Sequence, residues 1–204
     1  MPFEQSRLVL ASGNAGKLKE LTHQLAPLNI EVTSQADYEV ETVDETGLTF
    51  VENALLKARE ASRVSGLPAL GDDSGLVVQA LDGRPGIKSA RYAGKGAGDD
   101  ANIDKLVGEL EGLPEARRGA YFYCCLVLLR HADDPAPLIA TGRWHGYILE
   151  ERRGEGGFGY DPVFHDRDMG ATAAELPAAE KNRVSHRGRA LEDLMKLLDD
   201  LPGI

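Results

Sequence analysis

The sequence predicts a mixed α/β fold in which helices pack around one long central sheet. Segments with strand-like and helix-like patterns alternate along most of the 204 residues. Hydrophobic residues make up 42% of the chain, which is enough to bury a substantial core. Because the sequence contains no long linker, repeat or low-complexity tract, we expect residues 1–204 to form a single domain.

The first predicted elements are two strands with a helix between them. The apolar run LVLA at 8–11 predicts a strand, and KLKELTHQLA at 17–26 is helix-like. Residues 29–35, NIEVTSQ, favour a second strand. This alternation supports the α/β assignment.

A second helix and further strands are predicted in the middle of the chain. Thr49 and Glu52 form the pattern of a capping box, which predicts the start of a helix that ends near Gly66. Two strands follow, at 67–72 and 76–81, with a turn between them. Another turn is predicted at 82–86.

The remaining elements are predicted from their apolar patterns. Residues 101–110 have helical spacing, and residues 120–130 are apolar on both faces, as a central strand would be. Residues 137–151 favour a further, partly polar strand. A last helix is expected from about 187 to 201, because one stripe of its surface carries Leu191, Leu194, Leu198 and Leu201.

The composition excludes several classes of protein. Thirty-three acidic and 23 basic residues give a formal net charge of −10, which would repel the backbone of DNA or RNA. The start of the chain has no apolar signal segment, and no stretch approaches the roughly 20 apolar residues of a membrane helix. We therefore expect a cytoplasmic protein that binds neither a nucleic-acid polymer nor a membrane. The adjacent Cys124 and Cys125 lie in an apolar run and are expected to be buried packing residues.

A glycine-rich turn before the first helix is suited to phosphate. It consists of Ser12, Gly13, Asn14, Ala15, Gly16 and Lys17. Its glycines allow the backbone to approach an anion, amides at a helix start point outward, and the lysine adds a positive charge. A Walker A loop is disfavoured, because Ala11 stands at its first glycine position and Leu18 follows the lysine. Taken alone, the segment would be interpreted as an ordinary turn with a solvated lysine.

Acidic residues occur where the predicted sheet gives way to turns. Asp72 and Asp73 follow an apolar strand and offer the oxygen ligands that Mg²⁺ prefers. In a fully extended strand they would point to opposite sides, so only one could enter a cleft unless the chain bends between them. On its own, this pair fits a polar turn equally well, and Asp44-Glu45 fits a solvated loop. Lys57 on the predicted helix could contact phosphate or simply be exposed.

Two C-terminal segments are candidates for substrate binding. Residues 154–159 match GxGxxG, but charged residues precede them and residues 160–162 would interrupt a helix, which argues against a dinucleotide-binding turn. The glycines beside Phe158 fit either a loop that places its ring against a flat ligand or a turn with the ring in the core. Positive residues near the start of the last helix oppose its dipole, so either an anionic or carbonyl-rich ligand or nearby surface acids would account for them. They are Lys181, His186 and Arg187.

Six segments together carry a resemblance to a known family. They are SGNAGKLKEL at 12–21, ETGLTFVENALLKA at 45–58, GDDSGL at 71–76, PGIKSARYAG at 85–94, GGFGYDPVF at 156–164 and EKNRVSHRGRAL at 180–191. In this order and spacing the chain resembles the inosine triphosphate pyrophosphatase family, also called the XTP/dITP pyrophosphatases. The match covers nearly the whole chain, and one mild departure, Ala11-Ser12 in place of Ala-Thr, retains a hydroxyl group.

The resemblance implies a long mixed sheet, two lobes around a cleft, a homodimer and a Mg²⁺ cofactor. It also implies hydrolysis of deaminated purine triphosphates such as ITP, dITP and XTP to the monophosphate and pyrophosphate. Residues 12–17 and Lys57 would hold the triphosphate, Glu45, Asp72 and Asp73 would position the metal, and Asp73 would act as general base. The rest of the substrate pocket would consist of Ser74, Phe158, Gly159, Tyr160, Asp161, Lys181, His186 and Arg187.

Two alternatives remain open at this point. A Maf-like nucleotide pyrophosphatase shares the broad fold and reaction but would prefer thymidine, uridine or modified pyrimidine triphosphates. A nucleotide-binding sensor would retain the cleft without turnover and would release no pyrophosphate.

Overall fold

A computed structural model of the chain describes residues 7–26 and 31–199, and these residues form two compact units. Unit 1 comprises the described residues within 1–73, 124–142 and 186–204. Unit 2 comprises residues 74–123 and 143–185. No helix in the described part of the chain is long and apolar enough to cross a membrane.

Seven strands form one mixed sheet in the order β2-β1-β3-β4-β5-β6-β7. They are β1 (Arg7–Ala11), β2 (Glu31–Ser34), β3 (Ala69–Val78), β4 (Gly119–Leu129), β5 (Leu138–Ile148), β6 (Phe164–Asp166) and β7 (Ala171–Thr172). β1 is parallel to β2 and β3, whereas β6 is antiparallel to β5 and β7. The predicted α/β class and the central position of residues 120–130 are confirmed.

One strand differs from the prediction. Residues 67–72 and 76–81 were expected to be two strands separated by a turn, but β3 runs without interruption through Asp72, Asp73 and Ser74. The reason is that both carboxylates are paired with cations from other elements, so the strand can hold them in its interior. A 3₁₀ turn at Gln79–Leu81 follows the strand.

The helices of unit 1 follow local capping signals. α1 (Ala15–Leu25) begins two residues before the predicted start, because the Asn14 side chain accepts a hydrogen bond from the Lys17 amide. α2 (Phe50–Ser65) has the predicted capping box of Thr49 and Glu52 and ends at Gly66. α5 (His186–Asp199) matches the last predicted helix, although Leu201 lies outside the described residues.

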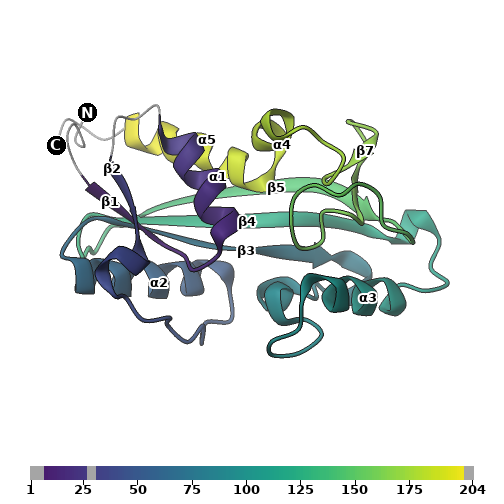
Figure 1. Ribbon diagram of the computed structural model, residues 1–204, viewed down its shortest axis with the longest axis horizontal. Coiled ribbons are helices and arrows are strands. Elements are labelled where there is room, and N and C mark those ends of the chain that lie inside the picture. The colour runs from purple at the N-terminus through teal and green to yellow at the C-terminus, as the bar shows by residue number, and fades with distance from the viewer. Residues whose placement is uncertain (1–6, 27–30, 200–204) are drawn as a thin grey trace. The chain divides into compact units, whose positions relative to one another are not determined.

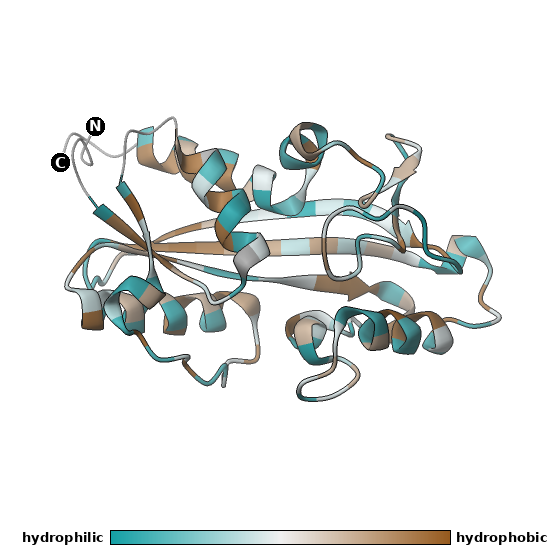
Figure 2. Ribbon diagram, viewed as in Figure 1, coloured by the Kyte–Doolittle hydropathy of each residue, from teal (hydrophilic) through white to brown (hydrophobic). Residues whose placement is uncertain are grey.

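Helices cover both faces of β1 in unit 1 (Figure 1). Leu8 and Leu10 pack with leucines of α1 and α5, whereas the alternating Val9 and Ala11 pack with Ala61 of α2. Hydrophobic residues gather along the strands, while the helices are hydrophobic on part of their surface only (Figure 2). Cys124 and Cys125 are fully buried free thiols in β4, as predicted.

Unit 2 has an aromatic core. The Trp144 and Phe122 rings lie 5.0 and 4.6 Å from the Phe164 ring, measured between centroids. α3 (Asp99–Glu109) confirms the helix predicted at 101–110. α4 (Ala178–Val184) was not predicted, because a polar helix of 7 residues carries little hydrophobic periodicity.

Candidate functional site

Asp72 is held by two cations in unit 1. Lys17 Nζ donates to its Oδ1 at 2.5 Å and Arg187 Nε donates to its Oδ2 at 2.9 Å. The residue is 1% exposed. Burial opposes ionisation, but Lys17 and Arg187 outweigh it and hold the pKa of Asp72 well below its usual range. Asp72 is therefore a buried carboxylate anion.

Arg187 is the centre of this charge cluster. It is 1% exposed, and its Nη1 pairs with Glu20 of α1. Burial disfavours the guanidinium charge, but Asp72 and Glu20 raise the pKa of Arg187. Glu20 was not singled out in the sequence, although it lies three positions after Lys17, on the same side of α1. Two nitrogens of Arg187 are committed to carboxylates, and its expected place in the substrate pocket stays a prediction.

Asp73 faces a different set of partners. Lys57 Nζ donates to its Oδ1 at 2.8 Å and Asn53 Nδ2 donates to its Oδ2 at 3.5 Å. The same ammonium group donates to Glu45 Oε1 at 3.1 Å. Burial raises the pKa of Asp73 above its ordinary value, although Lys57 stabilises its ionised form. Burial likewise disfavours the Lys57 ammonium, but Asp73 and Glu45 raise the pKa of Lys57.

The position of Lys57 follows from close packing between α2 and β3. A Cβ at Gly71 would lie 2.1 Å from the Ala54 carbonyl oxygen, so only glycine allows this approach. Asn53 and Lys57 are one helical turn apart and therefore share a face of α2. Both reach Asp73, and the Lys57 side chain is 16% exposed rather than solvated.

Glu45 and Asp73 form a pair of oxygen donors that could bind a metal ion. Their carboxylates share one ammonium group, which shows that both can face a single cation. Mg²⁺ prefers oxygen ligands and is usually held by one or two carboxylates together with waters and substrate phosphates, so this pair fits it. Asp72 fits less well, since Lys17 and Arg187 bind its two oxygens. Within residues 7–26 and 31–199, no three His, Cys, Asp or Glu side chains are grouped to hold a metal by themselves.

The glycine-rich turn lies at the start of α1 in the same unit. Ser12 is buried and its Oγ accepts a hydrogen bond from the Asn14 amide at 3.2 Å, while Gly13 and Asn14 are exposed. Ala15 and Gly16 form the first turn of α1 together with Lys17. The Lys17 side chain is directed to Asp72 and is 13% exposed. The turn therefore presents its exposed part to solvent at a helix N-terminus, where an anion is favoured.

A second group of predicted residues lies in unit 2. Asp161 Oδ2 accepts hydrogen bonds from Lys181 Nζ at 2.6 Å and from the Phe158 amide at 2.9 Å. The Lys181 ammonium lies 5.1 Å from the centroid of the Phe158 ring. Phe158 is half-buried and is not a member of the aromatic core, so the loop interpretation is favoured over the core interpretation. A Cβ at Gly157 would lie 2.0 Å from Asp161 Oδ2, which makes glycine necessary for this tight turn.

Four predicted site residues remain, and two of them, Tyr160 and Gly159, make hydrogen bonds to other parts of the fold. Tyr160 is buried, its hydroxyl donates to the Ser89 carbonyl at 2.9 Å, and burial raises its pKa. The Gly159 amide donates to Asp99 Oδ2 at 2.7 Å. Ser74 follows Asp73 in β3 and belongs to unit 2, whereas His186 is the buried first residue of α5 in unit 1.

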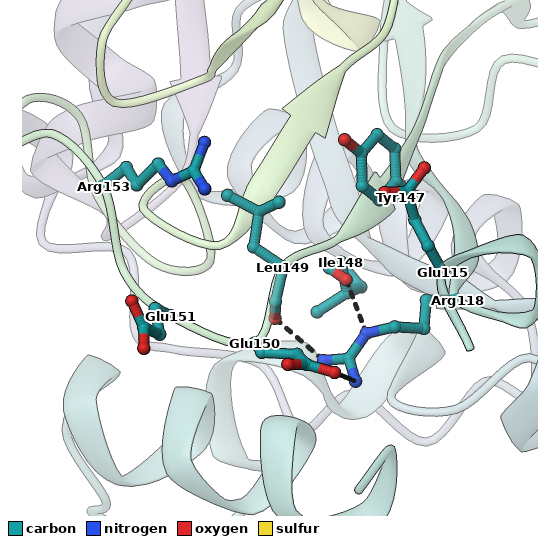
Figure 3. A pocket seen from close by; sticks show the side chains of 8 residues that line it. All are labelled: Glu115, Arg118, Tyr147, Ile148, Leu149, Glu150, Glu151 and Arg153. Atoms are coloured by element: carbon teal, nitrogen blue, oxygen red, sulfur yellow. Dashed lines mark hydrogen bonds and ion pairs between the residues drawn. The ribbon is translucent and has the colours of Figure 1, made fainter. Parts of the chain in front are cut away.

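Unit 2 also contains a hollow of about 320 Å³ (Figure 3). It is lined by Glu115, Arg118, Tyr147, Ile148, Leu149, Glu150, Glu151 and Arg153. Arg118 donates to the carbonyl oxygens of Ile148 and Leu149 at 2.7 and 2.9 Å and pairs with Glu150 (Figure 3). Arg118 therefore stabilises the chain at the end of β5, and these lining residues do not overlap with those proposed from the sequence.

Comparisons with known proteins agree with the motifs. The profile of the Ham1 family matches residues 8–197. The dITP/XTP pyrophosphatase of Xanthomonas oryzae pv. oryzae is 59% identical over 194 residues, which cover 95% of this chain and 98% of that protein. The dITP/XTP pyrophosphatase of Yersinia pseudotuberculosis is 53% identical over 194 residues, which again cover 95% of this chain and 98% of that protein. The structure of a HAM1 protein from Coxiella burnetii is similar, with a TM-score of 0.89 and 48% sequence identity. The match covers 97% of this chain and 100% of that protein's chain.

Proposed function

The chain belongs to the Ham1 family, and on this premise we propose that it is a hydrolase that converts non-standard purine nucleoside triphosphates to monophosphate and pyrophosphate. The proposed substrates are dITP and XTP, which appear in the names of the relatives, together with ITP, which the family resemblance implies. Removal of these compounds would cleanse the nucleotide pool of deaminated purines. The resemblance to the inosine triphosphate pyrophosphatases that the six motifs indicated is confirmed.

The cluster of Asp73, Lys57 and Glu45 is the observation that carries the chemical part of the proposal. Lys57 lies between the carboxylates of Asp73 and Glu45 in unit 1, the unit that also holds the glycine-rich turn. Lys57 and the turn at residues 12–17 would bind the negative charge of the triphosphate. Asp73 would accept the proton of the attacking water, which is directed to the α-phosphorus.

A divalent cation completes the site in this proposal. Glu45 and Asp73 would hold Mg²⁺, with Asp72 holding Lys17 and Arg187 in place beside them. The bound ion would neutralise charge that develops on the phosphate oxygens. Lys57 would then exchange its contact with these carboxylates for one with phosphate.

The purine would be recognised by the aromatic loop of unit 2. Phe158 offers a flat ring for stacking, and Lys181 and Asp161 hold this ring in place. Ser74, Gly159 and Tyr160 of the same unit would complete the contacts to the base, as the family resemblance implies. An oxygen at position 6 of the base favours hydrogen-bond donors, which would be left unpaired by the amino group of adenine.

We also propose that the protein acts in the cytoplasm as a homodimer, in line with the family resemblance. Light scattering coupled to size-exclusion chromatography would give twice the monomer mass of 22.0 kDa. A monomer over the concentration range of the activity assay would contradict this part of the proposal.

One assay tests the proposed reaction. Pyrophosphate and orthophosphate release would be measured with Mg²⁺ for dITP, ITP and XTP against ATP, GTP, TTP and UTP. We expect pyrophosphate from the first three and little reaction with the others. Preference for TTP or UTP would favour a Maf-like enzyme, nucleotide binding without product would favour a sensor, and initial release of orthophosphate would contradict the proposed bond cleavage.

A further inference from the structure

Asn53 is a buried polar residue beside the proposed metal site. It is the fourth residue of α2 and is 0% exposed. Its side chain amide donates to Asp73 Oδ2 at 3.5 Å, and its carbonyl oxygen accepts from the Gly47 amide at 2.9 Å. A single side chain therefore connects β3 to the loop that carries Glu45.

These contacts form a closed ring of interactions. Asn53 donates to Asp73, and Lys57 donates both to Asp73 and to Glu45. Glu45 is linked to Gly47 by two peptide units of the chain. The Gly47 amide donates to Asn53 and closes the ring. Because the ring closes, a shift of the Glu45 loop breaks at least one hydrogen bond to a buried group, which is costly.

The geometry points to Asn53 as a positioning residue, which holds the Glu45 loop and the Asp73 carboxylate in the arrangement that lets both face one cation. This inference rests on the proposed function, in which that cation is Mg²⁺. Partners that orient metal ligands in this way typically change metal affinity or activity by about 10- to 100-fold when they are removed.

The chemistry of the ring explains why an asparagine stands at position 53. An amide side chain of this length offers a donor to Asp73 and an acceptor to Gly47 at once. Aspartate would place a second carboxylate against Asp73 and supply no donor when ionised. Gly47 is equally specific, since a Cβ there would lie 2.7 Å from Asn53 Oδ1 and 2.5 Å from the Glu52 Cβ.

The test begins with Asn53→Ala. We expect the Mg²⁺ concentration for half-maximal dITP hydrolysis to rise about 10-fold or more, while KM for dITP at saturating Mg²⁺ changes less than about threefold, because the phosphate and base contacts remain. Two further measurements use the nucleotide-free protein. Mn²⁺ binding followed by electron paramagnetic resonance should weaken by about the same factor, and hydrogen exchange of the Gly47 amide should become much faster.

Asn102→Ala is a matched control. Asn102 is also the fourth residue of its helix, is 3% exposed, and holds a preceding loop through the Ala93 amide at 2.7 Å. Its removal should lower the melting temperature in a similar way but leave the Mg²⁺ and Mn²⁺ titrations unchanged. If Asn53→Ala and Asn102→Ala gave the same metal affinities and the same Gly47 exchange, the inference would be wrong.

A second variant covers the case in which Asn53→Ala does not fold. Gly47→Ala changes a loop residue and displaces the loop from Asn53 without removing the bond to Asp73. It should weaken Mn²⁺ binding and raise the Mg²⁺ requirement by about 10-fold, and normal values for both would overturn the inference. A wild-type protein whose Mn²⁺ affinity depends on Asn53 but which releases no pyrophosphate would instead contradict the proposed reaction.

Discussion

Asp72 and Asp73 are adjacent on β3, but their carboxylates bind different cations on opposite faces of the strand. Lys17 and Arg187 hold the first, and Lys57 holds the second. This separation follows from the alternation of side chains along an extended strand. It assigns the neighbours different tasks, because Asp72 organises buried positive charge while Asp73 faces the proposed metal site.

Asp73→Asn should nearly abolish turnover. Asparagine keeps the shape of the side chain but neither binds a metal as an anion nor accepts the proton of the attacking water, and loss of a general base costs about 100- to 10,000-fold. The measurement is pyrophosphate release from dITP at saturating Mg²⁺, with circular dichroism to confirm the fold.

The control for Asp73 is Asp134→Asn, which removes another buried aspartate of unit 1 that is paired with Arg130. It should leave turnover within about twofold of the wild type, since it lies outside the cluster. Near-normal turnover of a folded Asp73→Asn protein would show that Asp73 is neither the base nor an important ligand.

Glu45→Gln should raise the Mg²⁺ requirement. The amide retains the size of the side chain but loses the charge that would bind the cation, so half-maximal activity should need at least about 10-fold more Mg²⁺. At saturating Mg²⁺ much of kcat should return. Glu41→Gln, an exposed residue of the same segment, is the control, and identical Mg²⁺ titrations for both variants would count against Glu45 as a ligand.

Asp72→Asn should destabilise the fold in a pH-dependent way. Breaking a buried ion pair costs about 3 kcal/mol or more, because Lys17 and Arg187 remain buried without their carboxylate. The pKa of Asp72 is lowered in the folded chain, so its ionised form stabilises the fold above the unfolded pKa of about 4. That stabilisation is lost as the pH falls toward the folded pKa.

Urea unfolding at pH 7 and at several lower pH values checks this prediction. The difference between the wild type and Asp72→Asn should be largest at pH 7 and should shrink below about pH 4. Glu192→Gln, which breaks an exposed pair with Lys196, should leave the stability close to that of the wild type at each of these pH values. Equal stability of the wild type and Asp72→Asn at pH 7 would contradict the role of Asp72.

Arg187→Ala separates two roles of the arginine. Its buried pairs with Asp72 and Glu20 predict a loss of activity that is common to all nucleotides, together with a lower melting temperature. A role in base reading would instead reduce dITP and XTP hydrolysis far more than the slow reaction with ATP. We expect the common loss, measured as kcat/KM for the three nucleotides, and a selective loss would show instead that the arginine reads the base.

The local signals of the sequence predicted most of the fold correctly. Thr49 and Glu52 lie three residues apart and set the start of α2 without help from the rest of the chain. β3 was misread because Asp-Asp-Ser-Gly has the composition of a turn. The cations that keep it extended come from distant positions, since Lys17 lies 55 residues and Arg187 lies 115 residues from Asp72.

The candidate site could also be predicted only in part from the sequence. The motif residues were found because their types suit phosphate and metal chemistry, and contacts now join Lys17 to Asp72 and Lys57 to Asp73. Glu20 and Asn53 were missed as site residues, because a glutamate or asparagine on a helix carries no signal of its own. Their roles depend on which charged groups lie opposite them, and this is a property of the packing.

Phe158→Ala should weaken substrate binding without unfolding unit 2. The ring is half-buried beside Lys181 and outside the aromatic core, so its removal should cost far less stability than the roughly 3–5 kcal/mol of a core phenylalanine. Stacking of a base on an aromatic ring contributes about 1–3 kcal/mol, which predicts a rise in KM for dITP of about 5- to 150-fold. Phe158→Tyr keeps the ring and should restore KM, whereas Phe158→Leu keeps only the apolar volume and should not. A large loss of stability with an unchanged KM would place the ring in the structural core instead.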